Sequence, residues 1–402
     1  MSGGVTTAGA KRSLWVIIIG LWMIAMGTYL VVPFFTIYLR ETIGLTTLQV
    51  GMALTAKLWA SYGLTMVGGA LADRYGARMT MVIGLLIRAV SYMGIATAHS
   101  AFTVIAWSVL MGIGGALFNP ASKAAMAALA TNQDRVKLFS MRNTANNLGV
   151  SLGPMLGLAA LFSNPQTVFY IAALSYIGFA MLTLFMVGQL PGEHATKARP
   201  FNWRLVTWIA FDVRMLYLEA IIAFFMFLYV QMELTMPLYA NSQFGQWAVS
   251  ALFTVNAITV VCLQVPLSTF LSRRYPASVS VAMGLVGMAL GLLLVGLSNG
   301  VVLFLFAVFL FTMGEVIIDP RVDAETSDMV PPGTVGTALG ILGAMNAVGG
   351  TLGNMVGGPV YSRMAESGGM QSYWTWLGFG AIVGAVLVLV IGSLLEVPVE
   401  EE

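Results

Sequence analysis

The chain contains few charged residues and almost no cysteine. Only 9% of its 402 residues are charged, against roughly 25% in soluble domains, and 58% are apolar. Its one cysteine, Cys262, excludes an internal disulfide, CxxC redox chemistry and a cysteine-rich zinc site. Soluble proteins do not need so much apolar sequence, so the composition indicates an integral membrane protein.

Other absences narrow the class of function. The chain has only two histidines, His99 near an outer loop and His194 in a polar linker, and no phosphate-binding GxxxxGK[ST] loop. We therefore expect no enzyme activity, no cofactor, no metal site and no ATP-driven transport. A net charge of +2 with scattered basic residues gives no reason to expect nucleic-acid binding.

Long apolar runs fill the sequence, at roughly 20 residues per membrane span. Charged, polar or Gly/Pro interruptions divide the chain into twelve predicted spans, near 14–39, 48–72, 78–98, 102–130, 139–162, 167–190, 213–240, 246–271, 277–297, 301–328, 334–361 and 373–395. Outer loops hold only Arg40 and Arg363, whereas most other basic residues lie on the opposite side. The positive-inside rule then places both termini in the cytoplasm, with the protein in the inner or plasma membrane.

The two halves of the sequence can be aligned at an offset of 200 residues. The matches are 75–85 with 275–285, 114–120 with 314–320, and 146–157 with 346–357. One offset over separate spans indicates a duplication in parallel orientation, because an even number of helices separates each pair. We predict an all-α membrane protein with two pseudo-symmetric six-helix bundles, residues 1–190 and 213–402, around a central cavity, joined by a cytoplasmic linker at 191–212.

A polar motif lies between the second and third spans. It reads Gly69-Ala-Leu-Ala-Asp73-Arg74-Tyr-Gly76-Ala-Arg78. A small Gly69 lets helices approach, Gly76 suits a tight turn, and Asp73 can pair with basic groups or accept from the N-terminus of a nearby helix. This spacing resembles the loop motif of the major facilitator superfamily. The resemblance implies a conformational latch, which is one-sided here because Arg273 replaces the aspartate in the second half.

The fifth span carries Gly149, Gly153, Pro154 and Gly157. Small residues at this spacing form a smooth helix face, and proline removes a backbone hydrogen bond. The segment resembles the element that marks antiporters in the drug:proton exchanger branch of the superfamily, except that Leu158 replaces its last glycine. Ordinary packing of small residues is the alternative interpretation.

The tenth span contains three carboxylates, Glu315, Asp319 and Asp323, spaced four residues apart on one helical face. Like charges crowded in a low-dielectric site favour protonation of at least one of them, which a proton carrier requires. A structural salt network is the alternative, most of all for Asp323, Glu325 and Arg321. The seventh span adds Glu233, so the predicted proton-coupling residues are Glu315, Asp319 and Glu233.

The repeat also predicts a gate. Lys123 occupies the position equivalent to Asp323, and Asn119 the position equivalent to Asp319. We expect Lys123 and Asp323 to form an ion pair that closes the cytoplasmic side. Within the spans Lys57 needs a partner or a cavity, and Arg88 has no partner that the sequence identifies.

Aromatic residues of the first and seventh spans are candidates for lining a substrate cavity. With Asn119 from the fourth span, the predicted cavity residues are Tyr29, Phe34, Asn119, Phe225 and Tyr229. The fourth span lacks the arginine common in the superfamily, since it reads Ser108-Val-Leu-Met111-Gly112. This absence puts more weight on the carboxylates of spans seven and ten.

The resemblance implies a proton-coupled multidrug exporter of hydrophobic or cationic small molecules that works by alternating access. We expect a monomer whose partners are its substrate, protons and the lipid bilayer. An exporter or symporter of one defined solute, such as a siderophore, metallophore, sugar or organic acid, is the alternative, although Gly153-Pro154 disfavours symport. A membrane receptor or scaffold is disfavoured because it has no use for carboxylates along an intramembrane face.

Overall fold

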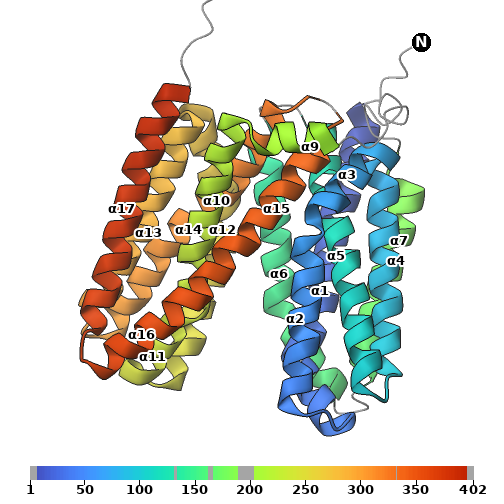
Figure 1. Ribbon diagram of the computed structural model, residues 1–402, viewed down its shortest axis with the longest axis horizontal. Helices are drawn as coiled ribbons and strands as arrows, with labels where there is room; N and C mark the ends of the chain where they lie inside the picture. The colour runs from blue at the N-terminus through green and yellow to red at the C-terminus, as the bar shows by residue number, and fades with distance from the viewer. Residues whose placement is uncertain (1–6, 131–133, 162–165, 189–202, 332, 396–402) are drawn as a thin grey trace, which may run out of the picture. The chain divides into compact units, whose positions relative to one another are not determined.

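The computed structural model describes residues 7–130, 134–161, 166–188, 203–331 and 333–395, and every regular element in them is a helix (Figure 1). The first elements are α1 (Thr7–Ile37), the π-helical turn η1 (Tyr38–Thr42), α2 (Thr47–Gly63), α3 (Thr65–Tyr75), α4 (Ala77–Ala96), α5 (Ala101–Leu129), α6 (Arg135–Leu161), α7 (Thr167–Met186) and α9 (Trp203–Ala210). They are followed by α10 (Val213–Glu233), α11 (Thr235–Phe244), α12 (Gln246–Arg274), α13 (Ala277–Leu297), α14 (Val301–Met329), α15 (Val335–Leu352), the π-helical turn η3 (Gly353–Gly357), α16 (Gly358–Glu366) and α17 (Met370–Leu395).

Ten helical stretches of the described chain are long and apolar enough to cross a membrane. They correspond to ten of the twelve predicted spans. The predicted second span is divided into α2 and α3 at Leu64, whose backbone angles (φ −103°, ψ 4°) interrupt the helix. The predicted fifth span is α6, whose first turns carry Arg135, Lys137 and Arg142. Both are helical, so the predicted all-α membrane fold is confirmed.

The chain forms two compact units. Unit 1 contains residues up to Ala210 and Thr326–Ala344, and unit 2 contains Phe211–Glu325 and the residues from Met345 on. The boundary at 210–211 falls in the predicted linker. The segment Thr326–Ala344, which the sequence placed with the second half, packs instead with unit 1. The two six-helix bundles therefore stay a prediction, with α14 and α15 each contributing residues to both units.

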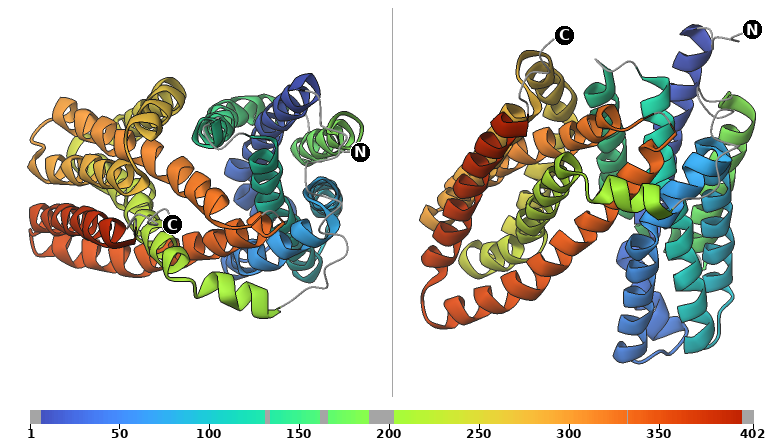
Figure 2. Two further views of the ribbon diagram at one scale, coloured as in Figure 1. Left: turned by 90° about the horizontal axis from the view of Figure 1, so that it is seen from above. Right: turned by 45° about the horizontal axis from the view of Figure 1, so that its top comes forward.

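Within unit 1, α1 packs on α6 and α7, and α5 packs on α2, α3 and α4. Figures 1 and 2 show α2, α4 and α5 running side by side. Glycines make these close approaches possible, because a Cβ at Gly68 would overlap the carbonyl of Ala116 and a Cβ at Gly84 would lie 2.7 Å from the carbonyl oxygen of Gly114. Small residues at contact points are the usual way in which membrane helices pack closely.

Unit 2 has the same kinds of contact at equivalent positions. Gly284 faces Gly314 at the crossing of α13 and α14, as Gly84 faces Gly114 in unit 1. Pro120 and Pro320 lie inside α5 and α14, again one repeat apart. The alignment at an offset of 200 residues therefore predicts which helix surfaces touch within each unit.

Gly349 on α15 offers a test of this packing. A Cβ there would overlap the carbonyl group of Ala223 on α10, a backbone atom that cannot move aside cheaply. We expect Gly349→Ala to destabilise the purified protein by about 1–3 kcal/mol, seen as a lower thermal midpoint in detergent. Gly380→Ala on α17 is the matched control, because nothing lies within 4 Å of its Cβ position and alanine favours helix. Equal midpoints for the two variants would contradict the close contact.

Candidate functional site

Glu315 lies on α14 within unit 2, where a residue of a neighbouring helix binds its carboxylate. The side-chain amide of Asn256, on α12, donates to Oε2 of Glu315 at 3.0 Å and to the hydroxyl of Thr312 at 3.1 Å. The Thr312 hydroxyl in turn donates to the carbonyl of Val308 at 2.9 Å. Asn256 and Thr312 are buried. A buried amide thus holds the carboxyl group in one orientation.

Glu233 and Asp319, the other predicted proton-coupling residues, lie close enough to Glu315 for their charges to act on it. Glu233 ends α10, and other residues of the protein leave it exposed. Tyr229, one turn earlier, is within hydrogen-bonding reach of the Glu233 carboxylate. Carboxyl groups of α10 and α14 thus lie within electrostatic reach of Glu315 in unit 2, and the proton-coupling role of the three residues stays a prediction.

The predicted cavity residues have different surroundings. Phe225 is buried and packs on Tyr229, with ring centroids 5.9 Å apart. Tyr29 is partly buried and lies near enough to Arg88 to act on its charge. Asn119 is partly buried, and its carbonyl accepts from Ser122 at 2.9 Å. The side chain of Phe34 lies outside the described residues.

Gln231, which was not among the predicted site residues, is completely buried on α10. Its amide nitrogen donates to the carbonyls of Phe227 (3.0 Å) and Gly353 (3.2 Å). Its amide oxygen accepts from the hydroxyls of Tyr373 (2.7 Å) and Thr235 (3.2 Å). A Cβ at Gly357 would overlap this amide. Gln231 therefore connects α10 to the π-helical turn η3 and to α17, next to Glu233.

Glu219, on α10, is a carboxyl-bearing residue that was not among the predicted site residues. Its side chain is 8% exposed, and its Oε1 has no hydrogen-bond partner among the described residues. A polar residue one turn and a half into an apolar helix is the signal that could have identified it. It is a further carboxyl group within the spans of unit 2.

Asp73, in the predicted latch, caps a helix rather than pairing with a basic group. Its Oδ1 accepts from the backbone amide of Gly336 at 2.9 Å, and its Oδ2 accepts from the amide and hydroxyl of Thr337, each at 2.6 Å. All three donors lie in the first turn of α15, in unit 1. A carboxylate at this position satisfies free amides and complements the helix dipole.

The other residues of the motif support this contact. A Cβ at Gly69 would overlap the carbonyl of Gly336, so glycine lets α3 and α15 approach. Gly76 separates α3 from α4 with φ +93°, a conformation that favours glycine. Arg78 donates to the carbonyl of Leu184 near the end of α7. Arg74 lies over the ring of Tyr75, 5.1 Å from its centroid.

The predicted antiporter segment is described only in part. Gly149 is buried where α6 crosses α1, and a Cβ there would overlap the side chain of Ala25. The side chains of Gly153, Pro154 and Gly157 lie outside the described residues, although α6 continues as helix to Leu161. Gly349, the repeat partner of Gly149, makes the equivalent contact with α10, the first helix of the second half.

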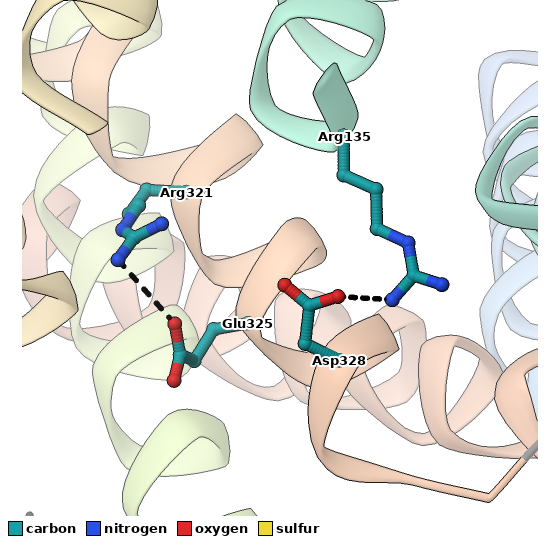
Figure 3. A network of polar contacts seen from close by, with 4 residues as sticks. All are labelled: Arg135, Arg321, Glu325 and Asp328. Atoms are coloured by element: carbon teal, nitrogen blue, oxygen red, sulfur yellow. Dashed lines mark hydrogen bonds and ion pairs between the residues drawn. The ribbon is translucent and has the colours of Figure 1, made fainter. Parts of the chain in front are cut away.

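Ion pairs lie along the second half of α14 (Figure 3). Within unit 2, Arg321 and Glu325 pair one turn apart at 3.5 Å. Two of the three residues of the structural salt network considered for Asp323, Glu325 and Arg321 are therefore paired, and the network as a whole stays an alternative. Within unit 1, Arg135 at the start of α6 pairs with Asp328.

Asp323 is 2% exposed in unit 2 and Lys123 is partly buried in unit 1, so their ion pair stays a prediction. No group of three or more His, Cys, Asp or Glu residues in the described chain could hold a metal ion.

Comparison with known proteins gives consistent results. The family model described as Major Facilitator Superfamily matches residues 17–353 and 246–402. The curated "Multidrug resistance protein MdtH" of Escherichia coli (strain K12 / DH10B) is 25% identical over 371 residues, covering 92% of this chain and 91% of that protein.

Solved structures show the same fold. The human organic anion transporter MFSD10 (TETRAN) superposes with a TM-score of 0.76 at 18% identity, covering 94% of this chain and 99% of that one. The proton:xylose symporter XylE gives 0.76 at 14% identity, covering 94% and 95%. The Escherichia coli fucose:proton symporter FucP gives 0.74 at 13% identity, covering 94% and 98%.

Proposed function

Because the chain belongs to the major facilitator superfamily and is thus a multi-pass membrane transporter and not an enzyme, we propose that it is a proton-coupled exporter of hydrophobic small molecules. The observation that carries the proposal is the carboxyl cluster of unit 2. There Glu315 is held by Asn256 within electrostatic reach of Glu233 and Asp319. An ionised carboxyl group inside a span costs several kcal/mol unless it faces a water-filled cavity or a partner, so carboxyl groups in spans usually mark functional sites.

Proton exchange at this cluster drives the transport cycle. Protonation of Glu315 from the outside removes the charge that Asn256 stabilises and favours substrate release. Deprotonation toward the cytoplasm restores the charge and the binding conformation. The two states alternate access to the site, as secondary transporters do. Both termini lie in the cytoplasm, and the protein works in the inner membrane.

The likeness to a multidrug resistance protein supports export of apolar compounds, and aromatic side chains such as Phe225 and Tyr229 suit them. The cationic compounds that the resemblance implied fit the carboxylates of unit 2. They do not fit unit 1, where the charged groups far inside the spans are Lys57 and Arg88.

Proteoliposomes test the function. With an inward pH gradient and a pH-sensitive dye inside, adding a transported hydrophobic compound should produce proton movement in liposomes that contain the protein and none in empty liposomes. A substrate panel tested in cells without other exporters identifies the compound. Transport at the same rate with and without the pH gradient would overturn proton coupling. Transport of only one polar metabolite would favour an exporter of a defined solute.

A further inference from the structure

Two basic residues lie deep within the spans of unit 1. Lys57 is ten residues into α2, and Arg88 is eleven residues into α4 and eight from its end. At 1.5 Å per residue, each charge lies about 12 Å or more along the span from either end, since α3 extends the span of Lys57. Both side chains are partly buried, and their charges are close enough to repel one another.

The surroundings of Arg88 hold its side chain in place. The guanidinium lies over the ring of Tyr176, 4.8 Å from the centroid. Tyr176 is completely buried, stacks on Tyr92 at 5.4 Å and shares a hydrogen bond of 2.6 Å with the hydroxyl of Thr28. A Cβ at Gly114 would overlap Cγ of Arg88, so glycine on α5 makes room for the arginine stem. Four helices thus build this position.

Among the described side chains of unit 1, no carboxylate is seen to neutralise these charges. Its described acidic side chains are Asp73, Asp134 and Asp328. Asp73 caps α15, Asp328 pairs with Arg135, and Asp134 precedes α6 at the end of the span. In the sequence, Asp73 is the only acidic residue between Glu41 and Asp134. The Nε of Arg88 is buried without a hydrogen-bond partner among the described residues.

Two like charges within a span are costly without a countercharge. A cation–π contact with the Tyr176 ring reduces the free-energy cost of burying the Arg88 charge, but the ring supplies no net negative charge. An arginine fork and a lysine ammonium are together the donors that bind a carboxylate tightly.

We propose that Lys57 and Arg88 bind the carboxylate of the transported molecule, so that the substrate is an amphipathic organic anion. This inference rests on the proposed export function and adds the charge of the substrate to it. Unit 1 supplies the recognition of the anion, and the carboxyl groups of unit 2 carry the proton. An anionic substrate differs from the cationic compounds that the resemblance implied.

A matched set of ligands tests the charge preference on the full-length protein in detergent. The probes are 1-naphthoate, benzoate and 4-phenylbutyrate, each compared with the amine of the same carbon skeleton, and binding is followed by thermal shift and calorimetry. We expect the carboxylates to bind and to raise the thermal midpoint, and the amines to have no effect. Tighter binding of the amines, or no binding of any carboxylate, would overturn the proposal.

Variants test the residues. Lys57→Gln and Arg88→Gln should each weaken carboxylate binding by about tenfold or more, the loss of one charge-assisted hydrogen bond. Lys57→Arg should restore most of it. Lys137→Gln, a change of the same kind at an exposed site of α6, should bind normally. If Arg88→Gln fails to fold, the test rests on Lys57→Gln. Unchanged carboxylate binding by Lys57→Gln would contradict the anion site.

Glu315→Gln separates this inference from the export function. We expect this variant still to bind 1-naphthoate, more weakly because glutamine resembles the protonated carboxyl group, while losing proton-driven transport. Proton-driven transport of amines by the wild type would leave the proposed function intact and refute the anion site. Carboxylate binding that depends on Lys57, without proton movement in the wild type, would support the anion site and refute the coupling.

Discussion

Glu315→Gln is expected to abolish transport driven by a pH gradient. Glutamine has the same shape and its amide oxygen can still accept from Asn256, which donates to Oε2 of Glu315 at 3.0 Å, so the fold around α12 and α14 should persist. It cannot take up and release a proton. In proteoliposomes with an imposed pH gradient, the accumulation of substrate should fall to the level of empty liposomes.

The control for this variant is Glu366→Gln. Glu366 ends α16 with an exposed side chain, so this change removes one negative charge without touching the carboxyl cluster. It should transport like the wild type. Glu315→Asp, which keeps the carboxyl group on a shorter side chain, should retain part of the activity. Full gradient-driven transport by Glu315→Gln would remove Glu315 from the mechanism.

Asp73→Ala is expected to give the second largest loss of transport. The carboxylate accepts three hydrogen bonds from Gly336 and Thr337, and each charged hydrogen bond contributes about 1.5–3 kcal/mol. Losing them frees the start of α15, whose residues from Met345 on belong to unit 2. We expect the initial rate of transport to fall by about tenfold or more, and Thr337→Val, which removes one donor, to fall less.

Asp212→Ala is the matched control for the Asp73 variant. Asp212 also caps a helix, since its carboxylate accepts from the amides of Arg214 (2.9 Å) and Met215 (3.3 Å) at the start of α10. Loss of an ordinary cap costs about 1 kcal/mol, so this variant should lose some thermal stability and little transport. Equal transport losses for Asp73→Ala and Asp212→Ala would show that Asp73 contributes only helix stability.

The sequence predicts much of the fold because it contains two strong signals. Runs of apolar residues define the spans, and the 200-residue offset identifies the glycines at helix crossings, such as Gly84 with Gly114 and Gly284 with Gly314. The break at Leu64 was not predicted because no proline or glycine cluster marks it. The packing of Thr326–Ala344 with unit 1 was not predicted either, because it depends on contacts between residues far apart in the sequence, such as Gly69 with Gly336.

Three charged residues of the candidate site, Glu315, Asp319 and Glu233, were predicted from the sequence, whereas Glu219 and the neutral Asn256 were not. Charges inside a span are rare enough to stand out, which is how Glu315, Asp319 and Glu233 were identified. Asn256 and Gln231 are neutral amides, which membrane spans tolerate at many positions. Only the contacts of Asn256 with Glu315 and of Gln231 with Tyr373 distinguish them. For the same reason Asp73 was recognised from its motif, whereas its partners on α15 required the structure.

Proton release on substrate binding tests the central claim most directly, that Glu315 carries the proton which drives transport. Purified protein in weakly buffered detergent solution should release protons to a pH-sensitive dye when a transported substrate is added. The variant Glu315→Gln should still bind the same substrate, more weakly because glutamine resembles the protonated carboxyl group, and release no proton. Equal proton release by the wild type and by Glu315→Gln would contradict the account.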